Sequence, residues 1–268
     1  MKSMSKSECK SEMMRILKYI DEIAQKNNIN YTLIGGSLIG ALRNNGIIPW
    51  DDDIDIGLTY DNYKQLIELI EKDGNKDFKL IYYENNESCY FPHTKIVSTR
   101  TYLKEKDFQE IDGMGVFVDI FIYMHLPNDE KNRKRFYNKL TTINKIIYSL
   151  RKPNKHEEKF VIKYIRFFVA NCILGKKRLF RAARKLYTKY NNTDYVVVNL
   201  PHYGYSKEIQ SIKCFDGYCK HIFEGEQIQI INNYDMMLKT TFGDYMTPPP
   251  EDKRENHELT AYWRNDEK

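Results

Sequence analysis

The sequence lacks the features that would place the protein in a membrane or in an oxidising compartment. Its polar first residues contain no apolar segment of the kind that secretory signals carry. No run approaches the ~18 uncharged apolar residues that a membrane-spanning helix needs. The five cysteines are odd in number and scattered, and no second pair accompanies Cys214 and Cys219, which disfavours a zinc site. We therefore expect a cytoplasmic protein with free thiols.

A strong charge and internal repeats are also absent. The 268 residues carry a formal net charge of +5, which suits an anionic substrate, a membrane surface or nucleic acid and selects none of them. We see no repeat and no low-complexity linker. The length allows one large domain, or a domain with a helical appendage, and a substantial buried core.

Hydrophobic periodicity predicts alternating helices and strands in the first half of the chain. The predicted helices span residues 12–26, 37–44 and 61–72, and the predicted strands span 31–34, 53–58, 78–83, 94–97 and 116–121. The strand at 116–121 is almost entirely apolar, so we expect it at the centre of the sheet. This order predicts an α+β protein with an α/β-like core.

Composition divides the chain into three parts. Residues 1–127 contain the expected catalytic core. Residues 128–190 are rich in Lys and Arg and almost free of Gly and Pro, and they predict a basic helical insert. Residues 191–268 return to strand and turn signals, and we expect them to complete the catalytic domain.

A glycine turn opens the most informative stretch, residues 34–58. Gly35 and Gly36 follow a predicted strand and would let the backbone approach a phosphate, with the amides of the next helix facing the anion. Ser37 adds a hydroxyl. Alone, such a turn is more often a plain tight turn, and it has neither the Walker Lys nor the Rossmann spacing. Its significance comes from the acidic segment, because Ser37 lies only sixteen residues before Asp53.

Four of the five residues from Asp51 to Asp55 are Asp. On a strand, Asp51, Asp53 and Asp55 share one face and Asp52 lies on the other. Crowded carboxylates need a cation, and hard oxygen ligands favour Mg²⁺ or Mn²⁺. Asp119 is the single charge in an apolar strand, where burial without a partner is costly, and the same metal would be its partner.

An acidic segment of this kind has three other interpretations. A run of Asp is commonly a solvated turn, and that interpretation stays open for the segment taken alone. An EF-hand loop fails because Ile56 and Asn62 stand where Gly and Glu are required. A sugar-nucleotide glycosyltransferase also uses an Asp-x-Asp pair. However, its nucleotide-binding half usually precedes the pair, and only about 50 residues do so here.

Together these residues resemble a known superfamily. Gly35-Gly36-Ser37, Asp53 with Asp55, and Asp119 resemble the pattern of the nucleotidyltransferases with a polymerase-beta-like fold. The stretch 35–58 is similar to the LicD family, and so are residues 91–96, 115–121 and 242–250, with Arg254 and His257 behind the last. Residues 128–190 carry no motif that we recognise. The resemblance implies a nucleotidyltransferase-fold mixed sheet flanked by helices, and a relation to fukutin.

The LicD resemblance implies a metal-dependent transfer of phosphocholine from CDP-choline to a sugar hydroxyl, with release of CMP. The acceptor would be a lipid-linked precursor of a cell-surface glycan of the teichoic acid or lipopolysaccharide type. Asp53, Asp55 and Asp119 would be catalytic and would hold Mg²⁺ or Mn²⁺ together with Asp51. Gly35-Gly36-Ser37 would hold the diphosphate.

The alcohol on the donor is less defined than the CDP part. Transfer of phosphoethanolamine, glycerol phosphate or ribitol phosphate from a CDP donor stays open, as does nucleotidyl transfer from a triphosphate. A non-enzymatic docking module is a third interpretation, which the intact Asp53, Asp55 and Asp119 disfavour. No nucleic-acid partner is expected.

Cationic and aromatic residues complete the predicted site. Lys95 is expected either on a phosphate oxygen or on the surface. Arg254 and His257 are expected either at a phosphate or acceptor or in a solvated tail. A quaternary ammonium would suit an aromatic box. The candidates are Tyr82, Tyr83, Tyr90, Tyr203 and Tyr205, although a core or surface position is the more common role for each.

Residues 160–187 combine basic, apolar and aromatic side chains. This pattern is typical of helices that lie on an anionic membrane surface. A lipid-linked acceptor would give the protein a reason to be peripheral at the inner face of a membrane. The alternative, a helix pair that packs on the catalytic domain, is equally consistent with the pattern.

Overall fold

A mixed sheet forms the centre of the protein. The computed structural model describes residues 2–105, 110–155, 157–254 and 259–264. Five strands lie side by side in the order β2 (Thr32–Leu33), β3 (Asp55–Thr59), β7 (Phe117–Leu126), β5 (Thr94–Ser98) and β4 (Phe78–Ile81). β8 (Tyr195–Val198) pairs with β7, and β9 (Gln210–Ser211) pairs with β8. β3 and β7 are parallel and the other pairs are antiparallel, so the α+β prediction is confirmed.

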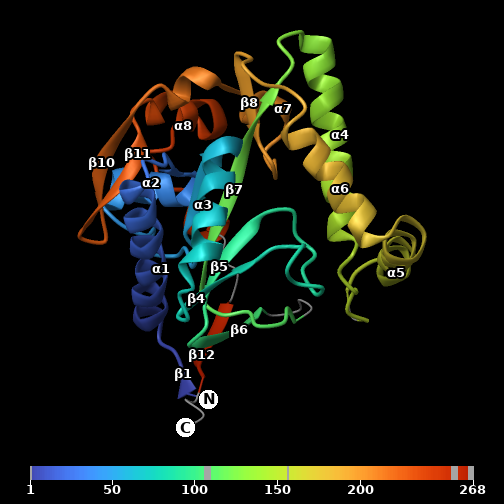
Figure 1. The fold of residues 1–268 in the computed structure, drawn as a ribbon, viewed down its shortest axis with the longest axis horizontal. Coiled ribbons are helices and arrows are strands. Elements are labelled where there is room, and N and C mark those ends of the chain that lie inside the picture. Colours follow the sequence, from blue (N-terminus) through green and yellow to red (C-terminus); the bar gives the residue numbers. More distant parts are fainter. Residues whose placement is uncertain (1, 106–109, 156, 255–258, 265–268) are drawn as a thin grey trace.

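β7 is the central strand, as its apolar sequence predicts (Figure 1). It is longer than expected, because residues 124–126 continue past β3 and β5, and residues 123–126 pair with β8. Residues from the C-terminal part of the chain therefore extend the sheet. The division of the chain into three domain parts stays a prediction.

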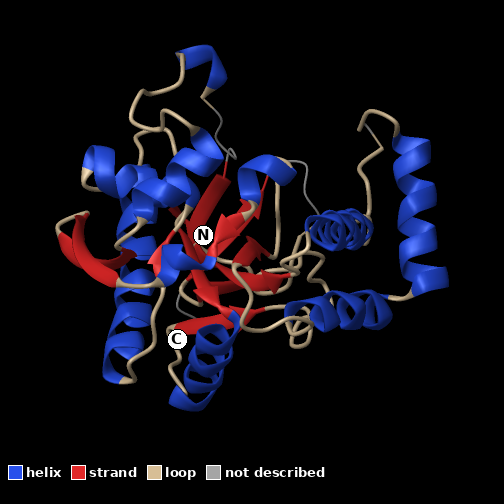
Figure 2. Cartoon of the chain, turned by 90° about the horizontal axis from the view of Figure 1, so that it is seen from above, coloured by secondary structure: helices blue, strands red, loops and turns tan. Residues whose placement is uncertain are grey.

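Two helices cover one face of the sheet (Figures 1 and 2). They are α1 (Lys6–Lys26) and α3 (Tyr60–Asp73), and beneath them lie buried strand residues such as Ile56 and Ile120. α1 begins six residues before the predicted start, because Ser5 and Glu8 form a capping box. The Ser5 N–H donates to Glu8 Oε2 (2.7 Å), and the Glu8 N–H donates to Ser5 Oγ (3.2 Å).

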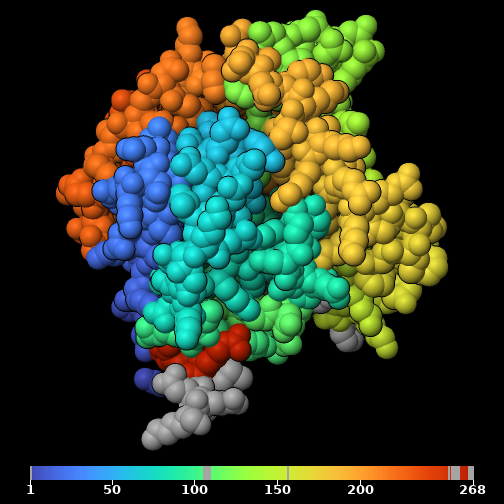
Figure 3. All heavy atoms as spheres, in the orientation of Figure 1, coloured from blue at the N-terminus to red at the C-terminus, as the bar shows by residue number. Residues whose placement is uncertain are grey.

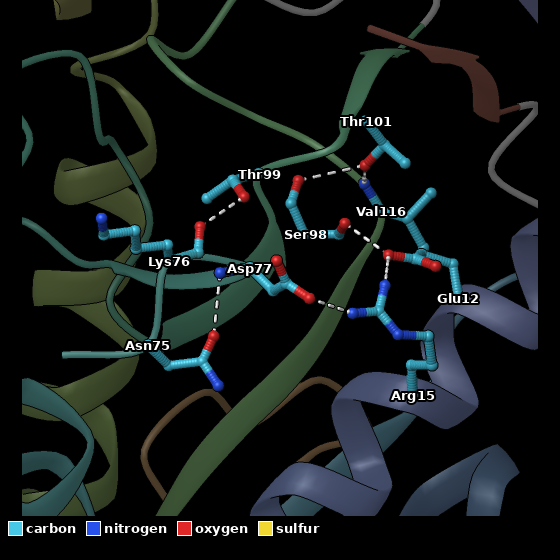
Figure 4. Close-up of polar contacts among 9 residues, drawn as sticks. All are labelled: Glu12, Arg15, Asn75, Lys76, Asp77, Ser98, Thr99, Thr101 and Val116. Atoms are coloured by element: carbon cyan, nitrogen blue, oxygen red, sulfur yellow. Dashed lines mark hydrogen bonds and ion pairs between the residues drawn. The ribbon is translucent and has the colours of Figure 1, made fainter. Parts of the chain in front are cut away.

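A polar network ties α1 to the end of β5 (Figure 4). The buried Glu12 carboxylate accepts hydrogen bonds from Ser98 Oγ (2.5 Å) and from Arg15 Nη1 (2.7 Å). The second Arg15 nitrogen, Nη2, binds Asp77 Oδ2 (2.6 Å). Because each buried polar group in this network has a partner, the network fixes the position of α1 on the sheet.

The remaining elements surround this core. The edge beside β2 carries α2 (Gly35–Asn44), α8 (Tyr234–Phe242) and the hairpin of β10 (Tyr218–Phe223) and β11 (Glu226–Ile231). Near the termini, β1 (Lys2–Ser3), β12 (Leu259–Trp263) and β6 (Thr101–Glu105) form a second sheet, which the sequence did not predict. The short helices are α7 (Tyr205–Glu208), the 3-10 turns Ile212–Phe215 and Glu251–Lys253, and the π-helical turn Val169–Leu174.

Three helices fill most of residues 128–190: α4 (Glu130–Tyr148), α5 (Phe160–Phe168) and α6 (Lys176–Tyr187). α6 packs against α4 and β7, whereas α5 projects from the side of the molecule (Figures 1 and 3). In the described part of the chain, no helix combines the length and the apolar character needed to cross a bilayer.

Candidate active site

Three charged side chains lie in one row across the sheet. The β3–β7 register places Asp55 beside Asp119, and the β5–β7 register places Lys95 beside Asp119. Residues in register on neighbouring strands point to the same face, so all three lie on the face opposite the one that α1 and α3 cover. The predicted alternation of Asp55 with the buried Ile56 is therefore confirmed.

Asp119 has Lys95 as its direct partner. Lys95 Nζ lies 2.7 Å from Asp119 Oδ1 and 2.8 Å from Oδ2, and both residues are 6% exposed. Burial acts to raise the pKa of Asp119, but Lys95 and His93 outweigh it, so this pKa lies below its ordinary value. Lys95 is thus a direct partner of this carboxylate that the sequence reasoning did not assign to it, while a contact of Asp119 with a metal stays a prediction. The sequence does not show which cation on a neighbouring strand falls into register.

His93 belongs to the site, although the sequence reasoning did not single it out. Its Nε2 lies 3.4 Å from Asp119 Oδ1, and its ring stacks between Phe91 (4.6 Å between centroids) and Phe121 (4.9 Å). Burial lowers the pKa of His93 and so favours the neutral ring. The spacing of His93 and Lys95, two residues apart at the start of a strand, places both on one face and was the available signal.

Asp51, Asp52 and Asp53 form an acidic loop rather than part of a strand. β3 begins only at Asp55, and each of the three carboxylates has an oxygen within 4.8 Å of those of the other two. The prediction that Asp52 points away from its neighbours was therefore wrong. Alternation requires an extended strand, and the chain turns here after Pro49, with the Asp51 N–H donating to the Ile48 carbonyl (2.9 Å).

The acidic loop and β3 together suit a divalent cation. Burial, followed by neighbouring carboxylates, raises the pKa of Asp53 and Asp55 well above the ordinary value. A bound cation would remove this penalty, because it stabilises the ionised carboxylates. The donor atoms are all hard oxygens, as Mg²⁺ and Mn²⁺ prefer. The residues present therefore fit such an ion.

The glycine turn lies directly against the acidic loop. Gly35 has φ +54°, where a larger residue would be strained, and a Cβ on Gly36 would lie 2.5 Å from Asp51 Oδ2, so the Asp51 carboxylate would have to shift. Ser37 Oγ accepts a hydrogen bond from the Asp55 N–H (2.9 Å) and is buried. The expected proximity of turn and carboxylates is present, while a contact of these residues with a diphosphate stays a prediction.

Arg254 reaches the acidic loop from the C-terminal part of the chain. Its guanidinium lies 4.3 Å from the ring centroid of Trp50, the residue before Asp51, and Arg43 lies 5.7 Å from the same ring. Burial, and then Arg254, lower the pKa of Arg43. A cationic region therefore borders the carboxylates. His257 lies outside the described residues.

Two cavities adjoin the carboxylates. The first, of about 320 Å³, is lined by residues that include Lys6, Lys10, Trp50, Asp51 and Asp52. The second, of about 140 Å³, shares Gly35, Gly36 and Asp55 with the site and is lined by Tyr203 among others. Two of the other aromatic candidates, Tyr82 and Tyr83, line a different pocket beside α6.

Comparison with known proteins identifies the kind of enzyme. The family model described as "LicD/FKTN/FKRP, nucleotidyltransferase domain" matches residues 28–155. The lipopolysaccharide cholinephosphotransferase LicD of Haemophilus influenzae is 30% identical over 98% of this chain and 99% of its own length. Ribitol 5-phosphate transferase FKRP of human and mouse is 38% identical over 50 residues, which are 19% of this chain and 10% of FKRP.

The protein is thus a transferase whose candidate active site is built on carboxylates and a glycine turn. It belongs to the LicD family, because the likeness to the Haemophilus enzyme spans nearly the whole of both chains.

Proposed function

We propose that this protein transfers a phospho-alcohol, phosphocholine in the first place, from a CDP donor to a sugar hydroxyl and releases CMP. The acceptor is a lipid-linked precursor of a cell-surface glycan, of the lipopolysaccharide or teichoic acid type. The observation that carries the proposal is the full-length likeness to a cholinephosphotransferase. The row of Asp55, Asp119 and Lys95 beside a glycine turn supports it, because phosphoryl transfer needs cations and amides around the phosphate oxygens.

Each group in the site has a distinct task in this proposal. Asp51, Asp53 and Asp55, with Asp119 at the edge of the set, would hold Mg²⁺ or Mn²⁺, which when bound neutralises charge on the diphosphate. Gly35-Gly36-Ser37 would place amides on the same phosphates. Lys95 is oriented by Asp119 and would face a phosphate oxygen. Since Lys95 and His93 lower the pKa of Asp119, we assign Asp119 to positioning rather than to proton acceptance.

Other donors remain alternatives to CDP-choline. CDP-ribitol is favoured by the shorter likeness to FKRP. CDP-ethanolamine and CDP-glycerol share the CDP group, and a nucleotidyl transfer would instead consume a triphosphate and release pyrophosphate. In every case we place the carboxylates within a nucleotidyltransferase fold formed by residues 1–127 and completed by 191–268.

The test is CMP release from CDP-choline, CDP-ethanolamine, CDP-glycerol and CDP-ribitol, each with and without Mg²⁺ and with a glycan acceptor. Asp55→Asn should lower kcat/KM at least about 100-fold, since it removes a charge from the centre of the site. Asp61→Asn, on the exposed start of α3, is the matched control and should retain activity. Absence of CMP from every donor would refute the proposed reaction, and full activity of Asp55→Asn would refute the assignment of the carboxylates.

We further propose that the protein works at the cytoplasmic face of a membrane and contacts it through α5 and the turn after it. The exposed apolar residues of this region are Val161, Ile162, Tyr164, Ile165, Phe168 and Ile173. Lys163 and Arg166 lie among them, and such a mixture suits an anionic lipid surface. α6 is less suited, because its apolar face is buried and Lys176 Nζ donates to the carbonyls of Asn86 (2.9 Å) and Glu87 (2.6 Å).

A further inference from the structure

A small cavity beside the acidic site, which we call the β3–α8 cavity, has a volume of about 140 Å³. This volume is below the ~300–1,000 Å³ typical of sites for drug-sized ligands, so its occupant is a small group rather than a whole nucleotide. Gly35, Gly36 and Asp55 belong both to its lining and to the acidic site. A group bound there would lie next to a phosphate held at the glycine turn.

The charges that line the β3–α8 cavity are negative. Among its lining residues in the described part of the chain are Asp55 and Glu208, and neither Lys nor Arg is present. Glu208 is 5% exposed and accepts hydrogen bonds from the Tyr137 hydroxyl (2.6 Å), the Tyr203 N–H (2.7 Å) and the His202 N–H. Because the carboxylate is held in place in a region of low dielectric, it attracts a cation more strongly than a solvated one would.

Gln210 adds a fixed acceptor to the same wall. It is 3% exposed, and its Nε2 donates to Thr241 Oγ1 (3.0 Å) and to the Met237 carbonyl (3.3 Å). These bonds orient the amide, and Gln210 Oε1 has no hydrogen-bond partner among the residues that the structure describes. A buried acceptor without a partner is unfavourable, because it loses its hydration and gains no hydrogen bond. A ligand that brings positive charge to Oε1 would offset this cost.

Aromatic side chains supply the rest of the lining. Phe121, Tyr123, Tyr203 and Phe242 all line the cavity. Tyr203 and Phe242 meet edge to face, with centroids 5.1 Å apart. Aromatic faces with carboxylates and without competing cations form the environment in which proteins bind organic ammonium groups. The first cavity differs, because Lys6 and Lys10 line it and give it both signs of charge.

We propose that the β3–α8 cavity binds the cationic ammonium group of the transferred alcohol, with Glu208 and Phe242 as the specificity-determining residues. The site thereby selects amino alcohols such as choline and ethanolamine over glycerol and ribitol. The identification of the bound group as part of a donor rests on the proposed function, whereas the affinity of the cavity for an organic cation does not.

Direct binding tests the cavity without any turnover. Choline and ethanolamine are titrated calorimetrically into the full-length protein, and dimethylbutanol serves as the neutral carbon isostere of choline. Choline should bind at least about tenfold more tightly than dimethylbutanol, because carboxylates and aromatic faces attract the charge. Glu208→Gln should abolish that preference. Equal affinity for choline and dimethylbutanol in the wild-type protein would overturn the proposal.

Donor preference tests the same residues in the reaction. Phe242→Leu and Glu208→Gln should each lower kcat/KM for the preferred amino-alcohol donor about tenfold relative to that for CDP-glycerol. Tyr19→Leu is the matched aromatic control, since Tyr19 belongs to α1 and packs on Phe78, and it should leave the preference unchanged. Thermal melting of each variant separates a lost fold from a lost contact.

The two proposals fail in different ways. If choline binds through Glu208 but no CDP donor yields CMP, the proposed reaction is refuted and the cation site is supported. If CDP-choline is turned over but Phe242→Leu and Glu208→Gln keep the wild-type donor preference, the reaction is supported and the cation site is refuted. A ratio of choline to ethanolamine affinity above one identifies choline as the preferred cation, and a ratio below one identifies ethanolamine.

Discussion

The central sheet and the helical segment of residues 128–190 each hold a carboxylate between two basic side chains, with different consequences. In the sheet, Asp119 and Lys95 are both buried, and the pKa of Asp119 is lowered only because Lys95 and His93 outweigh burial. In the helical segment, the pKa of Glu157 is lowered to about 2, and the main cause is its hydrogen bonds from Arg151. The first arrangement costs desolvation and marks a site, whereas the second connects a loop to α5.

The burial of apolar residues also differs between the neighbouring helices α5 and α6. α6 buries Leu179, Phe180, Ala183, Leu186 and Tyr187, while α5 has no buried residue although it is the more apolar helix. Buried charge in the sheet and exposed apolar surface on α5 are both unfavourable for an isolated protein. Each is therefore a place where we propose that a ligand or a membrane surface acts.

The largest expected effect on stability is at Lys95. Lys95→Met leaves Asp119 as an uncompensated buried charge and should lower the free energy of unfolding by about 3–5 kcal/mol. Lys64→Met, in an exposed pair with Glu68 (4.0 Å), should change it by less than about 1 kcal/mol. Urea unfolding measures both. A double variant, Lys95→Met with Asp119→Leu, should recover much of the loss, and equal effects of Lys95→Met and Lys64→Met would remove the distinction between the two regions.

A smaller effect is expected in the core of the helical segment. Phe180 is 2% exposed and stacks on Tyr83 with centroids 4.0 Å apart. Phe180→Ala should lower the free energy of unfolding by about 3 kcal/mol, because it opens a cavity. Phe168→Ala on α5, where the side chain is 54% exposed, should change it by less than about 0.5 kcal/mol. If the two variants melt at the same temperature, the packing described for α5 and α6 is wrong.

The ion pairs of Glu157 with Arg151 and Lys163 predict that about 1 kcal/mol of the unfolding free energy depends on pH. Two nitrogens of Arg151 donate to the Glu157 carboxylate (2.8 Å each), and Lys163 Nζ also donates to it (2.7 Å). The folded pKa is about 2 and the ordinary value is 4.5, so the ionised form stabilises the fold above pH 4.5. This contribution is lost as the pH falls from 4.5 towards 2.

Urea titrations of wild type and Glu157→Gln at several pH values measure that contribution. The difference in unfolding free energy should be constant above pH 4.5 and should shrink to zero near pH 2. A difference that does not change with pH would show that Glu157 acts through packing and not through its charge.

The smallest effect on stability should accompany a clear loss of membrane binding. Ile165→Ser with Phe168→Ser should change the unfolding free energy by less than about 0.5 kcal/mol per site, since both side chains are more than half exposed. The double variant should no longer co-sediment with vesicles of phosphatidylglycerol and phosphatidylcholine. Ile222→Ser, at an exposed site on β10, is the control. Co-sedimentation that is unchanged, or absent in the wild type, would refute membrane contact through α5.

Much of the core could be predicted because its signals are local. The helix at 61–72 and the strand at 94–97 were predicted within one residue of α3 and β5, since apolar periodicity reports which face each element buries. The acidic loop was wrongly predicted as a strand because alternation can be counted for any five residues. Only pairing with β7 decides that β3 starts at Asp55.

The sequence by itself determined which chemistry is available: the glycine turn, the acidic residues 51–55, the lone charge of Asp119 and the similarity to the LicD family. Only the tertiary structure decided that Lys95 is the partner of Asp119 and that His93 stands beside them. It also decided that Glu208 and Gln210 close a cavity beside Asp55. The physical reason is that these contacts depend on strand register and packing between residues far apart in the chain, which local periodicity does not encode.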